Sequence, residues 1–256
     1  ERITVRQETR QEMSDFAASE QSPPRLLQIR VGKCRPPADY HEKLGPEGWP
    51  CDIPSAYFKH EVSEVEVTFA GLEGNESGHP SHIENAQYRA AMIHNTLHNE
   101  YFKDLFPDHV FQPGDFGENF IVDHPSLTVN EVCVGDQYQI GSAIFRVSGP
   151  RFPCPKVDAA QKLKGVQKLG LENGWAGYFY EVMQEGVCKV GDEIRLLQRP
   201  HPGFTIHRVA SGMWGPKEKQ DHSREFIETL ANMEELIPRH FRITAQTRLA
   251  RLNAEA

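Results

Sequence analysis

The chain lacks the sequence features that mark several protein classes. Its five cysteines are an odd number, they are widely spaced, and none belongs to a Cys-x-x-Cys pair. That pattern fits neither a disulfide framework nor a zinc knuckle, so we expect a reducing, cytoplasmic compartment. No apolar run approaches the roughly 20 residues that span a bilayer. The Gly-x-Gly-x-x-Gly fingerprint of dinucleotide-binding proteins is also absent.

Positive net charge is missing as well. The formal net charge is -8 over 256 residues, which argues against a general affinity for nucleic-acid duplexes or acidic membranes. This total does not exclude a local basic pocket for a phosphorylated ligand. With 38% hydrophobic residues and 18 prolines, the composition predicts a globular, turn-rich protein with a substantial core.

The most informative stretch is Gly149-Pro150-Arg151-Phe152-Pro153-Cys154-Pro155-Lys156, which follows a strand-like alternation over residues 143–148. Its three prolines remove amide donors, so we expect Cys154 to lie outside helices and central strands. Arg151 and Lys156 flank this cysteine, and nearby cations favour the thiolate. Cys154 is therefore a candidate nucleophile or soft metal ligand. The alternative is a small buried core residue, and the prolines and charges favour the functional interpretation.

The rest of the first 200 residues reads as short strands with glycine turns. Alternating apolar residues predict strands at 27–31 and 65–69, and regularly spaced short strands from 116 to 197 suggest a barrel or sandwich. A helix should interrupt these strands around 158–169. Residues 33–60 form a long irregular segment, which is either a functional loop or a surface insertion.

Two histidines fall within a predicted helix over residues 85–106, which an i, i+4 apolar stripe indicates. His94 and His98 lie one turn apart there and could bind zinc together with His82 or Glu100. No glutamate follows His94 directly, so the metalloprotease pattern fails. Histidines at the edge of a core-facing stripe are the favoured interpretation.

The chain divides into three parts. We expect a disordered leader at residues 1–24, a mostly β (α+β) barrel domain at 25–199, and a small three-helix domain at 204–256. The switch to helical periodicity follows the hinge at residues 200–203. The predicted helices of the tail cover residues 206–213, 222–236 and 238–252.

Five short motifs occur in a fixed order along the chain. They are Gly117-Glu118-Asn119, Val134-Gly135-Asp136, Pro150 to Lys156, Gly177-Tyr178-Phe179-Tyr180-Glu181-Val182 and Gly191-Asp192. This order resembles the MOSC domain, named after the C-terminal domain of molybdenum cofactor sulfurase. The tail resembles the extension of bacterial MOSC proteins that confer resistance to 6-hydroxylaminopurine. The resemblance covers roughly residues 25 to 252.

The resemblance implies a MOSC-like β-barrel with surrounding helices and a bound molybdenum cofactor (molybdopterin). Cys154 would be the catalytic thiolate and the molybdenum ligand, since soft thiolates suit this metal. Arg151 and Lys156 would lie near anionic parts of the cofactor. The turn at Glu118 and Asn119 would line the same pocket, although Asn119 also fits a plain asparagine turn.

Two departures from the family pattern fall where the phosphate of the pterin would bind. His82-Ile83-Glu84-Asn85-Ala86 stands in place of a His-Gly-Gly-Pro-Asp segment, and Glu181 replaces an arginine. Lost glycines remove a close backbone approach, and the replacement of arginine by glutamate reverses a charge. His82 occupies the place of the family histidine, so we expect it to be a catalytic proton donor.

Three functions compete. The leading one is a molybdenum-dependent oxidoreductase that detoxifies N-hydroxylated compounds such as hydroxylaminopurines, using electrons from a partner reductase of flavin or iron–sulfur type. The second is a carrier of molybdenum cofactor or sulfur, with a persulfide on Cys154. The third is a zinc or iron enzyme built on His94 and His98. We expect no membrane partner, and a homodimer is one option for the assembly.

Overall fold

The computed structural model describes residues 22–44, 48–50 and 52–254, and for residues 81 and 82 it describes the backbone alone. Of the leader predicted at residues 1–24, residues 1–21 lie outside the described residues. No helix within these ranges is both long and apolar enough to cross a membrane.

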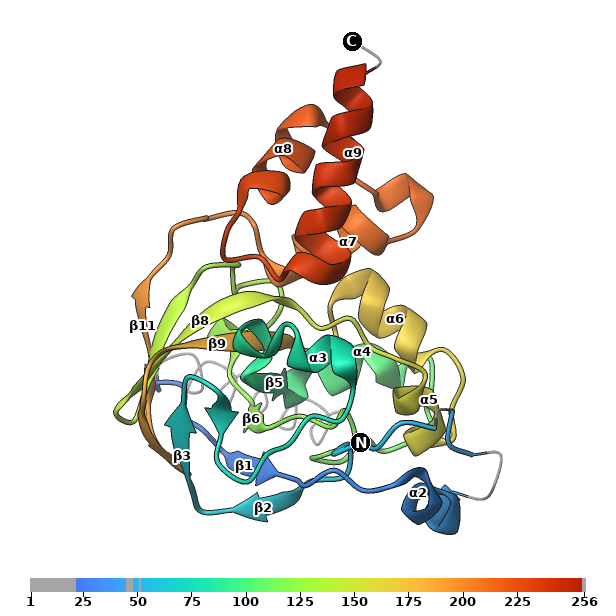
Figure 1. Cartoon of the computed structure of the whole chain (residues 1–256), viewed down its shortest axis with the longest axis vertical. Coiled ribbons are helices and arrows are strands. Elements are labelled where there is room, and N and C mark those ends of the chain that lie inside the picture. Colours follow the sequence, from blue (N-terminus) through green and yellow to red (C-terminus); the bar gives the residue numbers. More distant parts are fainter. Residues whose placement is uncertain (1–21, 45–47, 51, 255–256) are drawn as a thin grey trace, which may run out of the picture.

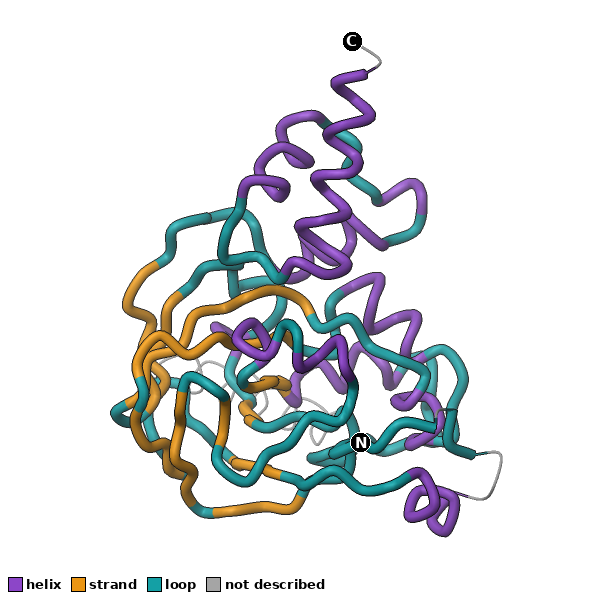
Figure 2. Tube along the Cα trace, in the orientation of Figure 1, coloured by secondary structure: helices purple, strands orange, loops and turns teal. Residues whose placement is uncertain are grey.

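An eight-stranded sheet curls into a half-barrel and forms the body of the molecule (Figures 1 and 2). Its strands are β1 (Gln28–Val31), β2 (His60–Val62), β5 (Ala91–Asn95), β6 (Phe120–Val122), β7 (Gln137–Ile140), β8 (Ala143–Pro150), β9 (Tyr178–Gln184) and β11 (Ile194–Gln198). They lie in the order β11-β7-β8-β9-β5-β6-β1-β2. The β5–β6 pair is parallel, and the other neighbouring pairs are antiparallel. A smaller sheet of β3 (Glu64–Thr68), β4 (Gly71–Leu72) and β10 (Gly186–Lys189) has the order β10-β3-β4.

The alternation predicted for residues 143–148 is confirmed in β8. Phe145 and Val147 are fully buried, while Ile144 and Arg146 are partly exposed. Tyr178 and Tyr180 on β9 face the same core. Side chains that alternate across a strand place one apolar face inward, and this pattern produces the predicted α+β barrel.

The predicted helix over residues 85–106 is wrong. The segment contains η1 (Ala86–Arg89), β5, η2 (Thr96–His98) and α4 (Asn99–Lys103). Every residue of β5 is buried, because Ala91 and Ile93 pack into the main core cluster and Met92 packs into a second cluster. A strand that is buried on both faces has no alternating pattern, so its apolar residues mimic a helical stripe.

The helix predicted around residues 158–169 is two helices, α5 (Lys156–Gln161) and α6 (Val166–Asn173). Lys162, with a positive φ of 54°, ends the first helix, and Gly165, with a φ of 105°, immediately precedes the second. The carboxylate of Asp158 accepts hydrogen bonds from the backbone N–H groups of Gly165 and Gln167, at 2.9 and 2.6 Å. This contact satisfies donors at the start of α6 and fixes the bend between the helices.

The other helical elements surround the half-barrel. They are α2 (Pro37–Leu44), α3 (Pro80–Ile83) and η3 (Pro125–Leu127), whereas η4 (Lys217–Lys219) lies in the C-terminal tail. The segment at residues 33–60, predicted to be irregular, therefore contains one helix. Its Tyr40 stacks on Trp49, with ring centroids 4.1 Å apart.

The helical tail is confirmed as α7 (Ile206–Trp214), α8 (Arg224–Asn232) and α9 (Ile243–Ala254), with a kinked turn η5 (Pro238–Arg242) before α9. Figure 1 shows these helices stacked on one end of the half-barrel. Their apolar residues belong to the same core cluster as Phe145 and Val147 of β8. The backbone N–H of Ile237 donates to the carbonyl of Ser148 at 2.7 Å. The tail is therefore docked on the half-barrel.

Gly149 lies where β8 meets the tail. Its φ is 139°, and a Cβ atom there would lie 3.0 Å from Leu236 Cδ1 and 3.2 Å from Ile237 Cγ2. Both the backbone conformation and the close approach favour glycine at this position.

Candidate functional site

A cavity of about 220 Å³ opens between the smaller sheet, η1 and the loop that carries Cys154. One of its walls is the stretch 54–59 at the end of the long segment 33–60. Of the two interpretations of that segment, the functional loop is therefore favoured. Part of the cavity floor comes from β4 and from Met92 on β5.

Cys154 lines this cavity from the loop between β8 and α5. It is a free, partly exposed cysteine, and the prediction that it lies outside helices and strands is confirmed. The structure brings Arg151 and Lys156 to the same cavity. The ammonium of Lys156 donates to the hydroxyl of Ser55 at 3.2 Å, which fixes it against the opposite wall. A free, partly exposed thiol in a cavity that also holds two cations is a candidate nucleophile or soft metal ligand.

Arg151 is buried with an unsatisfied donor. Its side chain is 7% exposed, and its Nη1 has no hydrogen-bond partner among the described residues. Its backbone N–H donates to Gly177 at 2.9 Å, which holds the loop against the start of β9. A buried guanidinium N–H without a partner is costly in a folded protein. An anionic ligand would satisfy it.

Two further cations, Arg89 and Lys59, make the cavity strongly basic. Burial lowers the pKa of Arg89 to about 10, and the charges of Arg239 and Arg151 add to the decrease. Burial likewise lowers the pKa of Lys59 to about 8, and its ammonium donates to the carbonyls of Ala56 and Gly117, each at 2.9 Å. No aspartate or glutamate is among the described residues that line the cavity. A chain with a net charge of -8 thus encloses a positive pocket, which favours anions.

Glu118 and Asn119 support the site in different ways. Asn119 lines the cavity, but its amide braces the backbone, since Oδ1 accepts from Met92 N–H at 3.1 Å and Nδ2 donates to the Arg30 carbonyl at 3.0 Å. Glu118 is fully buried behind the wall, and its carboxylate accepts from Phe116 N–H at 3.0 Å. Both residues shape the pocket, and their direct contact with a cofactor stays a prediction.

A histidine that the sequence analysis did not single out lies in the cavity wall. His79 lines the cavity just before α3, and burial lowers its pKa, with contributions from Lys156, Arg239 and Arg89. His82 lies in α3, and its side chain is outside the described part of the structure, so its catalytic role stays a prediction. The position of His79 immediately before Pro80, at the entry to a helix, is the only sequence signal that could have drawn attention to it.

Comparison with known families agrees with this geometry. The MOSC domain model matches residues 80–195, the stretch that carries Arg89, Arg151, Cys154 and Lys156. The chain carries a MOSC domain. The family resemblance inferred from the motifs is thereby confirmed.

Relatives and solved structures extend the likeness beyond the MOSC domain. The chain is 31% identical over 189 residues to a protein named Reductase from Gibberella moniliformis, a match that covers 72% of this chain and 31% of that relative. The chain thus spans under a third of that relative's length. It is 29% identical over 171 residues to protein YiiM of Escherichia coli, covering 66% of this chain and 75% of that protein. The crystal structure of YiiM from Geobacillus stearothermophilus superposes with a TM-score of 0.67 at 24% identity, covering 89% of this chain and all of that one, which confirms the fold.

The histidine pair of the MOSC domain is not on a helix. His94 lies on the central strand β5, and His98 ends η2, with their ring centroids 5.7 Å apart. His94 stacks on Phe116 at 4.2 Å, and Nε2 of His98 accepts from Val129 N–H at 3.1 Å. Burial lowers the pKa of both rings, so both are neutral near pH 7. No group of three metal-binding side chains occurs among the described residues, and the core interpretation of this pair is favoured.

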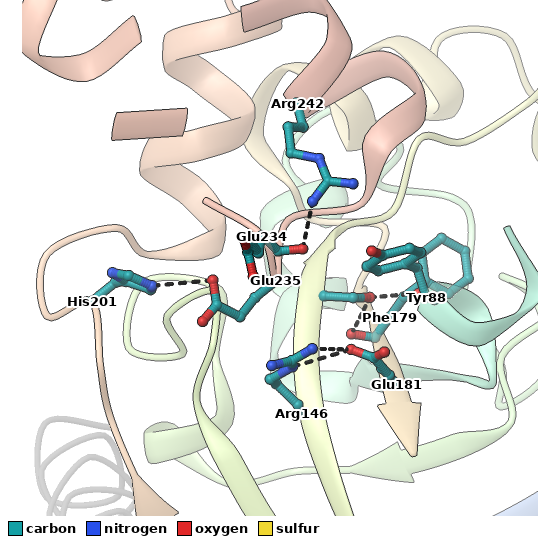
Figure 3. Close-up of polar contacts among 9 residues, drawn as sticks. Tyr88, Arg146, Phe179, Glu181, His201, Glu234, Glu235 and Arg242 are labelled. Carbon is teal, nitrogen blue, oxygen red and sulfur yellow. Dashed lines mark hydrogen bonds and ion pairs between the residues drawn. The ribbon is translucent and has the colours of Figure 1, made fainter. Parts of the chain in front are cut away.

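Glu181 in the MOSC domain is paired away from the cavity. Its carboxylate accepts from Nη2 and Nε of Arg146 on the neighbouring strand β8, at 2.6 and 3.1 Å (Figure 3). The replacement of arginine by glutamate is therefore matched by a local cation. Glu181 is not among the described residues that line the cavity, so the charge reversal leaves the positive pocket intact.

Proposed function

We propose that this protein is a molybdenum-cofactor-dependent reductase of N-hydroxylated compounds. The observation that carries the proposal is the partly exposed thiol of Cys154 in a cavity that has cations and no described carboxylate. The MOSC domain and the relative named Reductase support a molybdenum-associated redox function.

The cavity residues fit an anionic, thiolate-ligated cofactor. Cys154 would supply the soft ligand for molybdenum, and the unpartnered Nη1 of Arg151 together with Lys156 would hold the anionic part of the pterin. When bound, the cofactor supplies two-electron oxygen-atom chemistry, which no protein side chain provides.

The proposed reaction converts R–NHOH, two electrons and two protons into R–NH₂ and water. The N–O bond breaks, the nitrogen is reduced, and an external flavin or iron–sulfur reductase supplies the electrons. His79 lines the cavity, and its lowered pKa leaves the ring neutral near pH 7, so it would first take up a proton from solvent and then pass it to the leaving oxygen; His82 is the second candidate for this role. The apolar wall formed by Met92, which is buried, and Phe179, which is partly buried, would limit access of water to the reacting group.

The test measures molybdenum content and turnover in the same preparation. Native protein is analysed for molybdenum, then supplied with a hydroxylaminopurine or an amidoxime and a chemical or flavoprotein reductant. Stoichiometric molybdenum with formation of the amine supports the proposal. Molybdenum without turnover on several N–OH classes rejects the reductase and leaves a carrier. Absence of molybdenum from protein expressed with an intact cofactor pathway rejects both.

A carrier of sulfur is the second candidate, which the accessible thiol of Cys154 favours. Sulfane sulfur would pass from a donor persulfide to the Cys154 thiolate, which releases the donor thiol. Mass spectrometry of protein treated with a persulfide donor should then show an added sulfur on Cys154. An unmodified Cys154 peptide would exclude this function.

A further inference from the structure

The tail reaches the cavity through the kinked turn η5. Within it, Arg239 is extended and His240 has a left-handed conformation with φ of 71°. A non-glycine residue with positive φ is uncommon and persists where the surroundings hold it. Ile237, the residue before this turn, donates its backbone N–H to the carbonyl of Ser148 on β8. The turn is therefore fixed to the barrel by its backbone.

The ring of His240 covers a residue of the cavity wall. It stacks on Phe152, with centroids 4.0 Å apart and planes 17° apart, and Phe152 lines the cavity. Trp214 and Phe241 pack edge-on against the same ring, at 5.5 and 6.4 Å. The wall that faces the tail is thus supported by the tail itself.

The same turn holds η1, the element that carries Arg89. The guanidinium of Arg242 lies over the ring of Tyr88 at 5.7 Å, and the hydroxyl of Ser148 donates to the carbonyl of Tyr88. Figure 3 shows Arg242 near Tyr88, with Nη1 of Arg242 bound to the Glu234 carbonyl, a distance of 2.7 Å. Arg89 follows Tyr88 directly and lines the cavity. Arg89 and Arg239 are thus the direct sequence neighbours of Tyr88 and His240, two residues that lie in the contact between barrel and tail.

These two arginines are like charges without counter-charges. Neither takes part in an ion pair among the described residues, and Nε of Arg89 is buried without a hydrogen-bond partner. Arg239 is exposed and close enough for its charge to lower the pKa of Arg89 and of His79. Two facing cations repel each other, and an anion between them would convert this repulsion into attraction.

We propose that Arg239 of the tail and Arg89 of the barrel form a subsite for a phosphate monoester at the edge of the Cys154 cavity. Arginine pairs bind phosphate through several charge-assisted hydrogen bonds. Neutral His79 could add one more contact. A bound phosphate would then join the tail to the barrel.

This inference rests on the proposed function in one respect, that the cavity is a ligand site. Two molecules could bring the phosphate, namely the cofactor or a nucleotide form of the N-hydroxylated substrate. Arg151 lies deeper, 7% exposed beside Cys154, whereas Arg239 is exposed. The two sets of cations can therefore bind two different anionic groups.

The experiment measures phosphate recognition by the full chain freed of bound cofactor, without any redox assay. Adenosine 5′-monophosphate and adenosine are titrated by calorimetry at low salt into the parent, Arg239→Gln and Arg251→Gln. Arg251 is an exposed arginine near the far end of α9 and serves as the matched control. We expect the monophosphate to bind the parent better than adenosine, and Arg239→Gln to bind it about tenfold to a hundredfold more weakly, as the loss of a charged hydrogen bond predicts. Arg251→Gln should match the parent.

Hydrogen exchange provides a second readout. The monophosphate should slow exchange at residues 236–241 in the parent and not in Arg239→Gln. Equal affinity of Arg239→Gln and the parent, or no preference of the parent for the monophosphate over adenosine, would overturn the subsite.

The molybdenum content of Arg239→Gln identifies the source of the phosphate. If Arg239→Gln holds as much molybdenum as the parent, the subsite belongs to a phosphorylated substrate. If this variant loses molybdenum together with its affinity for the monophosphate, the subsite belongs to the cofactor. Phosphate recognition without N–OH reduction would reject the proposed function and keep the subsite.

Discussion

The Cys154 cavity and the His94–His98 pair both gather reactive side chains, yet their surroundings are opposite. In the cavity, the thiol is partly exposed and donors of Arg151 and Arg89 have no partner among the described residues. The two histidines are buried, and each has Nε2 in a hydrogen bond, Nδ1 without a partner among the described residues, and its ring stacked on an aromatic side chain.

The difference lies in open space and in uncompensated charge. The histidines are neutral because burial disfavours their protonation, and aromatic rings fill the space around them. The cavity keeps several cations together at an energetic cost that only an anion relieves. Residue type alone marks both places as candidate sites, whereas their environment favours only the cavity as a ligand site.

The largest effect should follow from Cys154→Ala. The variant should lose essentially all molybdenum and all turnover, because no other described thiol lines the cavity. Its circular dichroism should stay that of the parent, since a loop position contributes little core packing. Cys34→Ala removes a thiol of comparable, partial exposure and should keep its molybdenum. Equal metal content in Cys154→Ala and the parent would contradict the assignment.

Arg151→Gln should weaken retention of the cofactor by about tenfold to a hundredfold, because it removes a charged hydrogen-bond donor. Molybdenum loss during dialysis measures this effect. Arg146→Gln changes a cation that is paired with Glu181 instead and should retain the metal like the parent. If Arg151→Gln and Arg146→Gln release molybdenum at the same rate, Arg151 does not hold the cofactor.

His98→Ala should act on stability and not on the ligand. The variant leaves Val129 N–H without its acceptor and opens space in the core, which should cost about 1–3 kcal/mol in the free energy of unfolding. Urea denaturation checks this value. Folded His98→Ala should bind as much molybdenum as the parent, and the exposed His222→Ala should be as stable as the parent. A loss of metal from folded His98→Ala would make the histidine pair part of the site.

The pH dependence of stability should report the same pair. The pKa values of His94 and His98 are lowered in the folded protein. Below about pH 6.5, the ordinary pKa of histidine, the unfolded chain therefore binds more protons than the folded protein does. Stability should therefore be complete above this pH and fall as the pH is lowered. His240, whose pKa burial lowers to about 4, adds to the decrease. Thermal denaturation between pH 7 and pH 5 should show a shallower decline for His98→Ala than for the parent.

The smallest effect should come from Glu181→Gln. Its ion pair with Arg146 joins the neighbouring inner strands β8 and β9 and is partly exposed, and its loss should cost about 1 kcal/mol or less. Monophosphate affinity and molybdenum content should not change. A marked change in either property would show that Glu181 acts on the cavity after all.

Much of the fold was predictable because half-buried strands carry an alternating signal. Phe145 and Val147 revealed β8 in this way, and the prolines around Cys154 placed it on a loop. The strand β5 was not predictable, because burial on both faces removes the alternation and leaves only an apolar run. Arg89, Arg239 and His79 were missed because they are far apart in the sequence and meet only where η1, η5 and the approach to α3 converge.

The glycine at position 149 gives a criterion for other chains that combine a MOSC domain with a helical tail. A single methyl group there would press against Leu236 and Ile237, which would shift the turn that presents Arg239. Glycine at this point of β8, found together with an arginine at the matching place in the turn before the last helix, should therefore mark chains whose tail takes part in ligand recognition. Chains with a larger residue there should hold the tail farther from the barrel, and their pockets should rely on the barrel's own cations.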